Sequence, residues 1–292
     1  MVGHQGIAPC IPVWKTGVFL STSMLKKLEL IVVVGSFKRR NNPNMTIPAE
    51  LLQRLSAAKS VTVLTGAGVS AESGVPTFRD AQTGLWAKFR PEELATPRAF
   101  RSNPRLVWEW YEWRRKLVAD ANPNPAHLAL AEMERLFQRF HLITQNVDGL
   151  HQRAGSRNVI ELHGNITRTK CSEEGTIVSS WKDTGNVPPK CPACGGLLRP
   201  AVVWFEEPMP EEEMHQAMAA STHCDFFFSI GTSTVVYPAA ALPSEALRSG
   251  ATVVEINPQP TPFTAQAHFA LAGAAGVVLP KLVRDLNAIR GS

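Results

Sequence analysis

Short apolar runs alternate along the chain with longer stretches in which apolar residues recur every three or four positions. Four of these runs are rich in β-branched or aromatic residues and end in small or polar ones, as buried parallel strands do, at residues 60–65, 140–145, 224–230 and 251–256. The longer stretches predict helices at residues 49–58, 104–119, 125–138, 210–220 and 238–249. This alternation predicts an α/β fold with a Rossmann-like, doubly wound parallel sheet.

Sheets of this kind bind ligands beyond the carboxyl ends of their strands, where the polar turns of all four predicted strands fall. Segment 167–200 departs from the pattern, because it is hydrophilic and holds three of the five cysteines. We therefore expect a small helical or zinc-ribbon-like module there, inserted into a domain that spans residues 45–292.

The net charge of the chain is concentrated in its first 44 residues. Residues 1–44 hold six basic residues and one acid, which accounts for the whole formal charge of +5. Residues 45–292 are therefore balanced and show no electrostatic footprint for nucleic acid. No apolar stretch approaches the roughly 20 residues that span a bilayer. Neither nucleic acid nor a membrane is expected as a partner.

Two interpretations of residues 1–44 stay open. The segment is basic, poor in acids and bears hydroxyl groups, which is typical of a mitochondrial transit peptide if the source is eukaryotic. Alternatively, translation starts at Met45, and the extension is disordered or not part of the native protein. The second interpretation predicts a cytoplasmic protein.

The first predicted strand ends in a glycine turn, Gly66-Ala67-Gly68-Val69-Ser70. Its glycines permit a tight turn and the close approach of a pyrophosphate to the backbone. A dehydrogenase would next show a second strand ending in an acid for the ribose, about 20 residues on. Residues 74–86 instead resemble a long loop, which disfavours an oxidoreductase.

Polar side chains also follow the second predicted strand, in Gln145-Asn146-Val147-Asp148. They can bond ribose hydroxyls or an amide. His163 comes after a further apolar run and directly before a glycine. Because an imidazole titrates near neutrality, His163 is a candidate general base.

Together these motifs resemble the sirtuin family of NAD-dependent protein lysine deacylases, over about residues 50 to 285. The matching residues are Gly66-Ala67-Gly68-x-Ser70, Gly74-Val75-Pro76-x-Phe78-Arg79, Thr144-Gln145-Asn146-x-Asp148, His163-Gly164, Gly231-Thr232-Ser233 and Asn257-Pro258.

The resemblance implies that NAD is a co-substrate and that acylated lysines of proteins are the partners. Nicotinamide and O-acyl-ADP-ribose are the implied products. His163 matches the base that deprotonates a ribose hydroxyl, and Asn146 and Asp148 also match catalytic positions. The implied cofactor contacts are Gly66, Ala67, Gly68, Ser70, Phe78, Arg79, Trp86, Gln145, Asn146, Asp148, Gly231, Thr232, Ser233, Asn257 and Ala275. The oligomeric state is left open.

Tyr111 and Arg114 share one face of the predicted helix 104–119. They match the signature of class III sirtuins, which remove malonyl, succinyl and glutaryl groups. A buried acyl carboxylate needs a partner, and a guanidinium can bind it bidentately while a phenol donates a further bond. The resemblance therefore implies a preference for succinyl and malonyl groups, with acetyl groups also removed.

The substrate peptide is expected to pair as an added strand against residues 202–205, in contact with Val203 and Phe205. Glu206 stands where this family has glycine.

Cys171, Cys191 and Cys194 match three positions of the family's four-cysteine zinc site, but the fourth position is Glu174. Zinc accepts a carboxylate oxygen, although structural sites favour cysteine and histidine. Either zinc is bound, or Cys191 and Cys194 form an oxidisable pair.

Two other functions stay open. Capture of the cleaved sugar by another nucleophile would make a protein ADP-ribosyltransferase. A non-catalytic NAD or acyl-lysine reader would bind without turnover, and it would not need a ribose base at His163.

Overall fold

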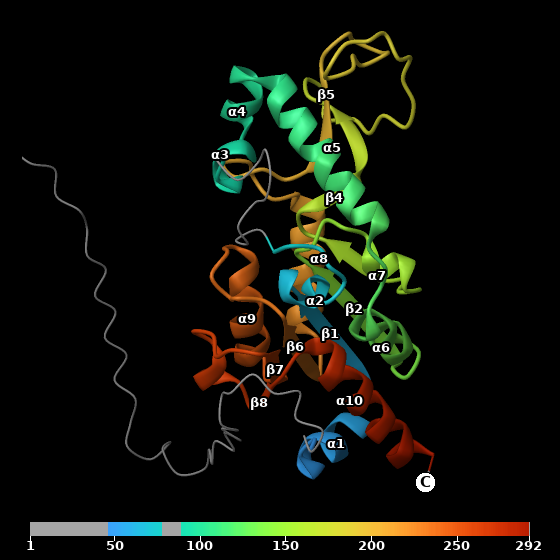
Figure 1. Ribbon diagram of the computed structural model, residues 1–292. Coiled ribbons are helices and arrows are strands. Elements are labelled where there is room, and N and C mark those ends of the chain that lie inside the picture. The colour runs from blue at the N-terminus through green and yellow to red at the C-terminus, as the bar shows by residue number, and fades with distance from the viewer. Residues whose placement is uncertain (1–45, 78–88, 292) are drawn as a thin grey trace, which may run out of the picture. The chain divides into compact units, whose positions relative to one another are not determined.

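The computed structural model describes residues 46–77 and 89–291, so the extension 1–44 lies outside the described residues. At its centre is a six-stranded, all-parallel sheet with strand order β3-β2-β1-β6-β7-β8 (Figure 1). The strands are β1 (Ser60–Thr65), β2 (Arg139–Thr144), β3 (Val159–Glu161), β6 (Phe226–Ile230), β7 (Thr252–Asn257) and β8 (Phe269–Ala272). The doubly wound parallel sheet predicted from the sequence is confirmed.

Strand β1 lies in the middle of the sheet and is buried along its whole length. In register, Val61 lies opposite Phe140 of β2 and Phe226 of β6. Val61 packs into one core layer of the sheet, and Leu64 packs into the other. Each fully buried side chain of this size contributes about 1.5–3 kcal/mol, which explains why the strand is apolar on both faces.

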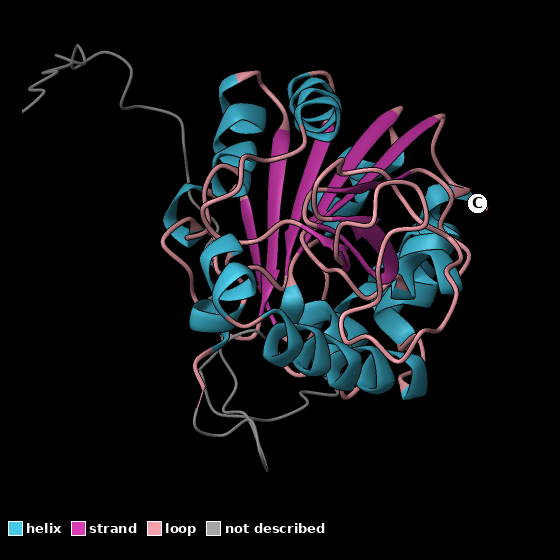
Figure 2. Cartoon of the chain, turned by 90° about the horizontal axis from the view of Figure 1, so that it is seen from above, coloured by secondary structure: helices cyan, strands magenta, loops and turns pink. Residues whose placement is uncertain are grey.

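Helices cover both faces of the sheet (Figure 2). Three of them share a core layer on one face: α1 (Ala49–Ser56), α6 (Pro125–Glu134) and α10 (Ala275–Arg290). On the other face lie α8 (Glu211–Thr222), η2 (Ala239–Ala241) and α9 (Leu242–Arg248). The connections also contain three short helical elements: α2 (Ala67–Ala71), α7 (Leu150–Arg153) and η3 (Thr264–Gln266).

A smaller layer combines helices with a two-stranded antiparallel sheet, at the top of Figure 1. It consists of α3 (Pro91–Leu94), α4 (Pro97–Ser102), α5 (Pro104–Asp120), β4 (Gly164–Cys171) and β5 (Leu198–Val202). Helix α5 begins at Pro104 because the Asn103 side chain accepts a hydrogen bond from the Leu106 amide at 3.1 Å. Residues 172–197, which include the Cys191-x-x-Cys194 pair, connect β4 to β5.

The predicted elements agree with the structure except where the sequence signal is short or interrupted. Strands β3 and β8 were not predicted, since runs of three and four residues show no clear period. Strands β4 and β5, at the two ends of the segment expected to form the small module, were not predicted either. Helix α10 was also missed, because Pro280 lies inside it and alanine and glycine precede it. The predicted helix 238–249 is a 3₁₀ turn, η2, followed by α9.

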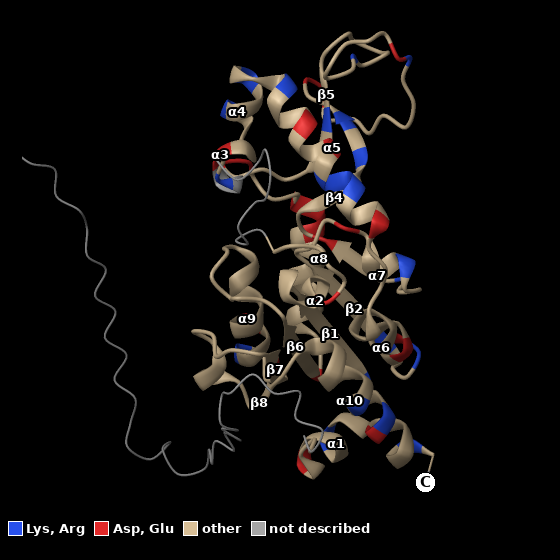
Figure 3. Ribbon diagram, viewed as in Figure 1, with Lys and Arg blue, Asp and Glu red and all other residues tan. Residues whose placement is uncertain are grey.

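Charges of both signs are mixed along α5 and α10 in Figure 3, as expected from the balanced composition of residues 45–292. Among the described residues, no helix combines the length and the apolar character that crossing a membrane requires.

Candidate active site

A cavity of about 1000 Å³ lies beyond the carboxyl ends of β1, β2 and β6. The turns that follow these strands line it, together with α5 and the segment after β5. Among the predicted site residues, those that line it are Gly66, Ala67, Gly68, Ser70, Tyr111, Arg114, Gln145, Asn146, Asp148, His163, Val203, Phe205, Gly231, Thr232, Ser233 and Asn257. The structure thus brings together groups that are spread over most of the chain.

Four predicted cofactor contacts are not among the residues that line this cavity. Ala275 is buried as the first residue of α10. Phe78, Arg79 and Trp86 lie outside the described residues.

The glycine turn after β1 touches the turn after β6, backbone against backbone. The Gly68 amide donates to the Gly231 carbonyl at 2.8 Å, and the Gly66 amide donates to the Ile230 carbonyl at 3.0 Å. A Cβ atom on Gly68 would lie 2.7 Å from the Gly231 oxygen, well inside van der Waals contact. Glycine is therefore required for this close approach, which leaves the backbone of both turns facing the cavity.

Asn146 ties the end of β2 to the glycine turn and is 8% exposed. Its Nδ2 donates to the Gly66 carbonyl at 3.1 Å and to Ser70 Oγ at 3.0 Å. Its backbone amide donates to Thr144 Oγ1 at 3.0 Å. These three bonds fix the carboxamide at the cavity wall before any ligand arrives.

Thr232, in the turn after β6, is bonded by side chains from the ends of β2 and β7. Gln145 Nε2 donates to Thr232 Oγ1 at 2.9 Å, and Asn257 Nδ2 donates to the Thr232 carbonyl at 3.1 Å. The polar side chains at the ends of β2 and β7 are thereby held in place around the same turn.

The tautomer of His163 follows from its hydrogen bond. Nδ1 lies 2.8 Å from the Gln145 carbonyl oxygen. A carbonyl only accepts, so Nδ1 carries the proton and Nε2 keeps its lone pair. Burial lowers the pKa of His163 below its ordinary value of 6.5, while the bond to Gln145 acts in the opposite direction. The side chain is therefore a neutral base at neutral pH.

Tyr111 and Arg114 reach the cavity from α5. The Arg114 guanidinium carbon lies 5.1 Å from the centroid of the Trp110 ring. Burial lowers the pKa of Arg114, and Tyr111 and Asp148 act against this shift. Burial also raises the pKa of Tyr111 to about 12, so its phenol stays protonated and can donate.

Asp148 is buried at the start of α7, where Oδ1 accepts a hydrogen bond from the Leu150 amide at 2.9 Å. Its carboxylate acts electrostatically on Arg114 of α5 and on His127 of α6. Asp148, which follows β2, and Arg114 of α5 therefore influence each other electrostatically.

Two fully buried histidines, His127 and His151, were not predicted. Their ring centroids lie 4.8 Å apart. His127 Nδ1 accepts from the Asn124 amide at 3.2 Å in the capping box of α6, and His151 Nε2 lies 3.0 Å from Thr65 Oγ1. Burial lowers the pKa of His127 to about 4 and that of His151 to about 3. The Asn124-Pro125 start of α6 was the available signal for the first of them.

The segment after β5 already uses its amide groups within the chain. The amide of Val203 donates to the His163 carbonyl at 2.9 Å, and that of Phe205 donates to the Ala95 carbonyl at 2.9 Å. The Trp204 amide donates to Glu207 Oε2 at 2.8 Å. An added peptide strand would therefore have to pair with carbonyl oxygens of this segment.

Glu206 adopts a left-handed backbone conformation with φ of 72°. Only glycine takes this conformation without strain, which explains why glycine is expected at this position. The Glu206 side chain lines the cavity and lies 3.8 Å from Arg98 in an exposed ion pair.

The thiols of Cys171, Cys191 and Cys194 lie within 4.8 Å of one another. A tetrahedral zinc with Zn–S distances of about 2.3 Å spaces its sulfurs about 3.8 Å apart, so the three thiols fit three of its corners. All three cysteines are free thiols. Glu174 is exposed and does not belong to this group of the described residues.

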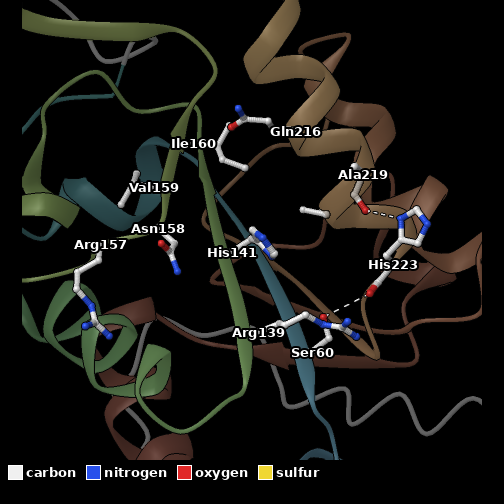
Figure 4. A pocket seen from close by; sticks show the side chains of 11 residues that line it. Ser60, Arg139, His141, Arg157, Asn158, Val159, Ile160, Gln216, Ala219 and His223 are labelled. Atoms are coloured by element: carbon white, nitrogen blue, oxygen red, sulfur yellow. Dashed lines mark hydrogen bonds between the residues drawn. The ribbon is translucent and has the colours of Figure 1, made fainter.

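A second cavity of about 600 Å³ lies at the opposite ends of β1 and β2, beside α8. In Figure 4, His141 and Arg139 come from β2. His223 directly follows α8, and its Nδ1 donates to the Ala219 carbonyl at 2.9 Å. Among the described residues, no predicted site residue lines this cavity.

The larger cavity combines four kinds of group. Backbone at two glycine turns suits phosphates, and carboxamide and carboxylate side chains suit ribose hydroxyls. A neutral imidazole with an oriented lone pair suits proton abstraction. A guanidinium beside a phenol suits an anionic group. Groups of these four kinds can together bind a nucleotide, take up a proton and bind an anionic group.

Residues 66–238 match the sequence profile of the Sir2 family. The chain therefore belongs to the Sir2 family. It is 54% identical to the NAD-dependent protein deacylase of Aquifex aeolicus, over 75% of this chain and 92% of that protein.

Solved structures of this family align with most of the chain. A complex of a Sir2 homolog with NAD is 47% identical, with a TM-score of 0.78, over 84% of this chain and 96% of that one. A Sir2 complex with a p53 peptide and NAD+ is 31% identical, with a TM-score of 0.70, over 84% and 99% of the two chains.

Proposed function

We propose that the protein is an NAD-dependent protein lysine deacylase. The observation that carries this proposal is that the glycine turns after β1 and β6 and the unprotonated Nε2 of His163 belong to one cavity. The complexes of related proteins with NAD and with a peptide support the same choice of reactants. When bound, NAD supplies a ribose carbon whose bond to nicotinamide can be broken in favour of the acyl oxygen.

The turns that follow β1 and β2 hold the dinucleotide. The turn from Gly66 to Ser70 would let a pyrophosphate come close to the backbone, because Gly66 and Gly68 have no side chains, although their own amides already donate within the chain. Gln145, Asn146 and Asp148 would bind ribose hydroxyls and a carboxamide. Because Asn146 is already fixed by three hydrogen bonds, little reorganisation is needed on binding.

His163 accepts a proton from a ribose hydroxyl at Nε2, while Nδ1 stays bonded to the Gln145 carbonyl. This step prepares the sugar to take over the acyl group. A positioned general base is worth about 10²–10⁴ in rate, so His163→Ala lowers turnover by this factor. The pKa of His163 lies below 6.5, the ordinary value for histidine. Turnover should therefore fall only when the pH drops below the pKa of His163, because Nε2 is then protonated.

Tyr111 and Arg114 select acyl groups that end in a carboxylate. Hydrogen bonds to a charged group contribute about 1.5–3 kcal/mol each, or roughly 10- to 150-fold in favour of succinyl over acetyl. Arg114→Met should therefore lower the ratio of succinyl to acetyl turnover by a factor of this order. An equal loss of both activities would contradict the assignment.

The substrate peptide pairs with the segment that contains Val203 and Phe205, through its carbonyl oxygens. Residues 45–292 form the catalytic domain. Segment 167–200 is its cysteine module, with zinc held by Cys171, Cys191 and Cys194.

Mass spectrometry of the products tests the proposed reaction. The protein is incubated with NAD and a succinyl-lysine peptide, with His163→Ala as the control. The expected products are unmodified peptide, nicotinamide and O-succinyl-ADP-ribose. ADP-ribose attached to protein or peptide, without loss of the succinyl group, would identify a transferase instead.

A further inference from the structure

The phenol of Tyr111 is held by a residue that lies 93 positions away in the chain. Trp204 Nε1 donates a hydrogen bond to the Tyr111 oxygen at 2.9 Å. Both side chains are buried, with 2% of Trp204 and 4% of Tyr111 exposed. This contact joins α5 to the segment after β5, the two parts that border the acyl end of the proposed site.

The direction of this hydrogen bond decides what the phenol can do. An indole N–H only donates, so the Tyr111 oxygen must accept from it. The phenol's own proton therefore points away from Trp204 and stays available to an acceptor. Since Tyr111 lines the cavity beside Arg114, an acceptor that also contacts the guanidinium is favoured.

Trp204 is itself held from two sides. The guanidinium carbon of Arg199 lies 3.2 Å from the centroid of its ring, a close cation–π contact. Arg199 makes a bidentate pair with Glu207 at 2.5 and 2.9 Å, and Glu207 accepts the Trp204 amide at 2.8 Å. Arg199 also donates to the Val202 carbonyl at 3.0 Å. These contacts leave the indole little freedom to turn away from Tyr111.

We propose that Trp204 is a positioning residue for acyl selection, which orients the Tyr111 phenol as a donor to the terminal carboxylate of an acidic acyl group. The Arg199–Glu207 pair keeps the indole in this place. This inference rests on the proposed function, and specifically on the acyl preference assigned to Tyr111 and Arg114.

A double-mutant cycle tests it. Trp204→Phe keeps an aromatic ring but removes the N–H, and Tyr111→Phe removes the phenol oxygen. For each variant and for the double variant, kcat and KM are measured with succinyl-lysine and acetyl-lysine peptides. Trp108→Phe, a tryptophan of α5 in the cysteine module's core, serves as the matched control.

Tyr111→Phe should lower the ratio of succinyl to acetyl kcat/KM at least about tenfold, and Trp204→Phe about three- to tenfold. The loss should appear mainly in the KM for the succinyl peptide. In the Tyr111→Phe background, Trp204→Phe should cause no further change in the ratio, because its partner is gone. Trp108→Phe should leave the ratio as in the wild type.

Four results would overturn the inference. Additive losses in the double variant would show that Trp204 does not act through Tyr111. An equal loss for both peptides in Trp204→Phe would show a merely structural role. An unchanged ratio in Tyr111→Phe would remove the acyl preference itself and the inference with it. A lowered ratio in Tyr111→Phe but not in Trp204→Phe would overturn the inference and leave the proposed function intact.

The hydrogen bond can also be followed without Trp204→Phe, should that variant fail to fold. The chain has seven tryptophans, whose indole N–H groups give separate NMR resonances. Tyr111→Phe should move one of them upfield as Trp204 loses its acceptor. If none moves, the bond is absent and the inference fails.

Discussion

The buried pair His127 and His151 makes the fold sensitive to acid well above the range in which carboxylates titrate. Burial holds the pKa of these imidazoles at about 4 and about 3, compared with 6.5 for an exposed histidine. Below pH 6.5 the unfolded chain therefore binds protons that the folded chain does not. The free energy of unfolding must fall as the pH is lowered through this window.

The size of the effect follows from the two shifts. One unit of pKa difference corresponds to about 1.4 kcal/mol per group, so from pH 7 to pH 5 each histidine costs about 2 kcal/mol and the pair about 4 kcal/mol. Urea unfolding followed by circular dichroism at pH 7, 6 and 5 measures this loss. In the wild-type protein this pair alone should contribute a slope approaching 2.7 kcal/mol per pH unit near pH 5.

A double variant removes the titration while keeping the hydrogen bonds. His127→Asn places an amide oxygen where Nδ1 accepts from the Asn124 amide, and His151→Gln places an amide near Thr65 Oγ1. In this variant the slope between pH 6 and 5 should fall by up to about 2.7 kcal/mol per pH unit, which corresponds to two bound protons. A double variant with the full wild-type slope would refute the reasoning.

Three further predictions concern the backbone and the cysteine module. Gly68→Ala should destabilise the fold by about 1–3 kcal/mol and raise the KM for NAD, because its Cβ would lie 2.7 Å from the Gly231 oxygen; unchanged unfolding and NAD kinetics would contradict this. Glu206→Gly should stabilise the fold by about 1 kcal/mol, because it relieves a left-handed backbone, and a lower thermal midpoint would count against it. Wild-type protein purified without added metal should contain one zinc, and Cys191→Ser should lose it; equal metal content in both would refute the three-thiol site.

The sequence predicted those parts of the site that lie at strand ends. Strand β1 and the turn from Gly66 to Ser70 are adjacent in the chain, and the carboxyl ends of parallel strands necessarily meet at one edge. Asn146 and Thr232 could therefore be placed near this turn without coordinates. His163 was found because it follows a short apolar run and directly precedes a glycine.

Contacts between distant segments could not be predicted in the same way. Trp204 and Tyr111 come from different elements, and no periodicity reports that their polar atoms meet at 2.9 Å. The His127–His151 contact joins two helices whose apolar faces look ordinary. A peptide was expected to pair with the backbone of residues 202–205, but the sequence did not show that the amide groups of 203–205 already donate within the chain.

The most direct test of the proposed function is the release of nicotinamide by the purified protein, quantified by chromatography. NAD and a succinyl-lysine peptide are offered separately and together, and removal of the succinyl group is followed in the same samples. The expected result is one nicotinamide for each acyl group removed, only when both reactants are present. Acyl removal without NAD, or no nicotinamide in the presence of both, would contradict the account.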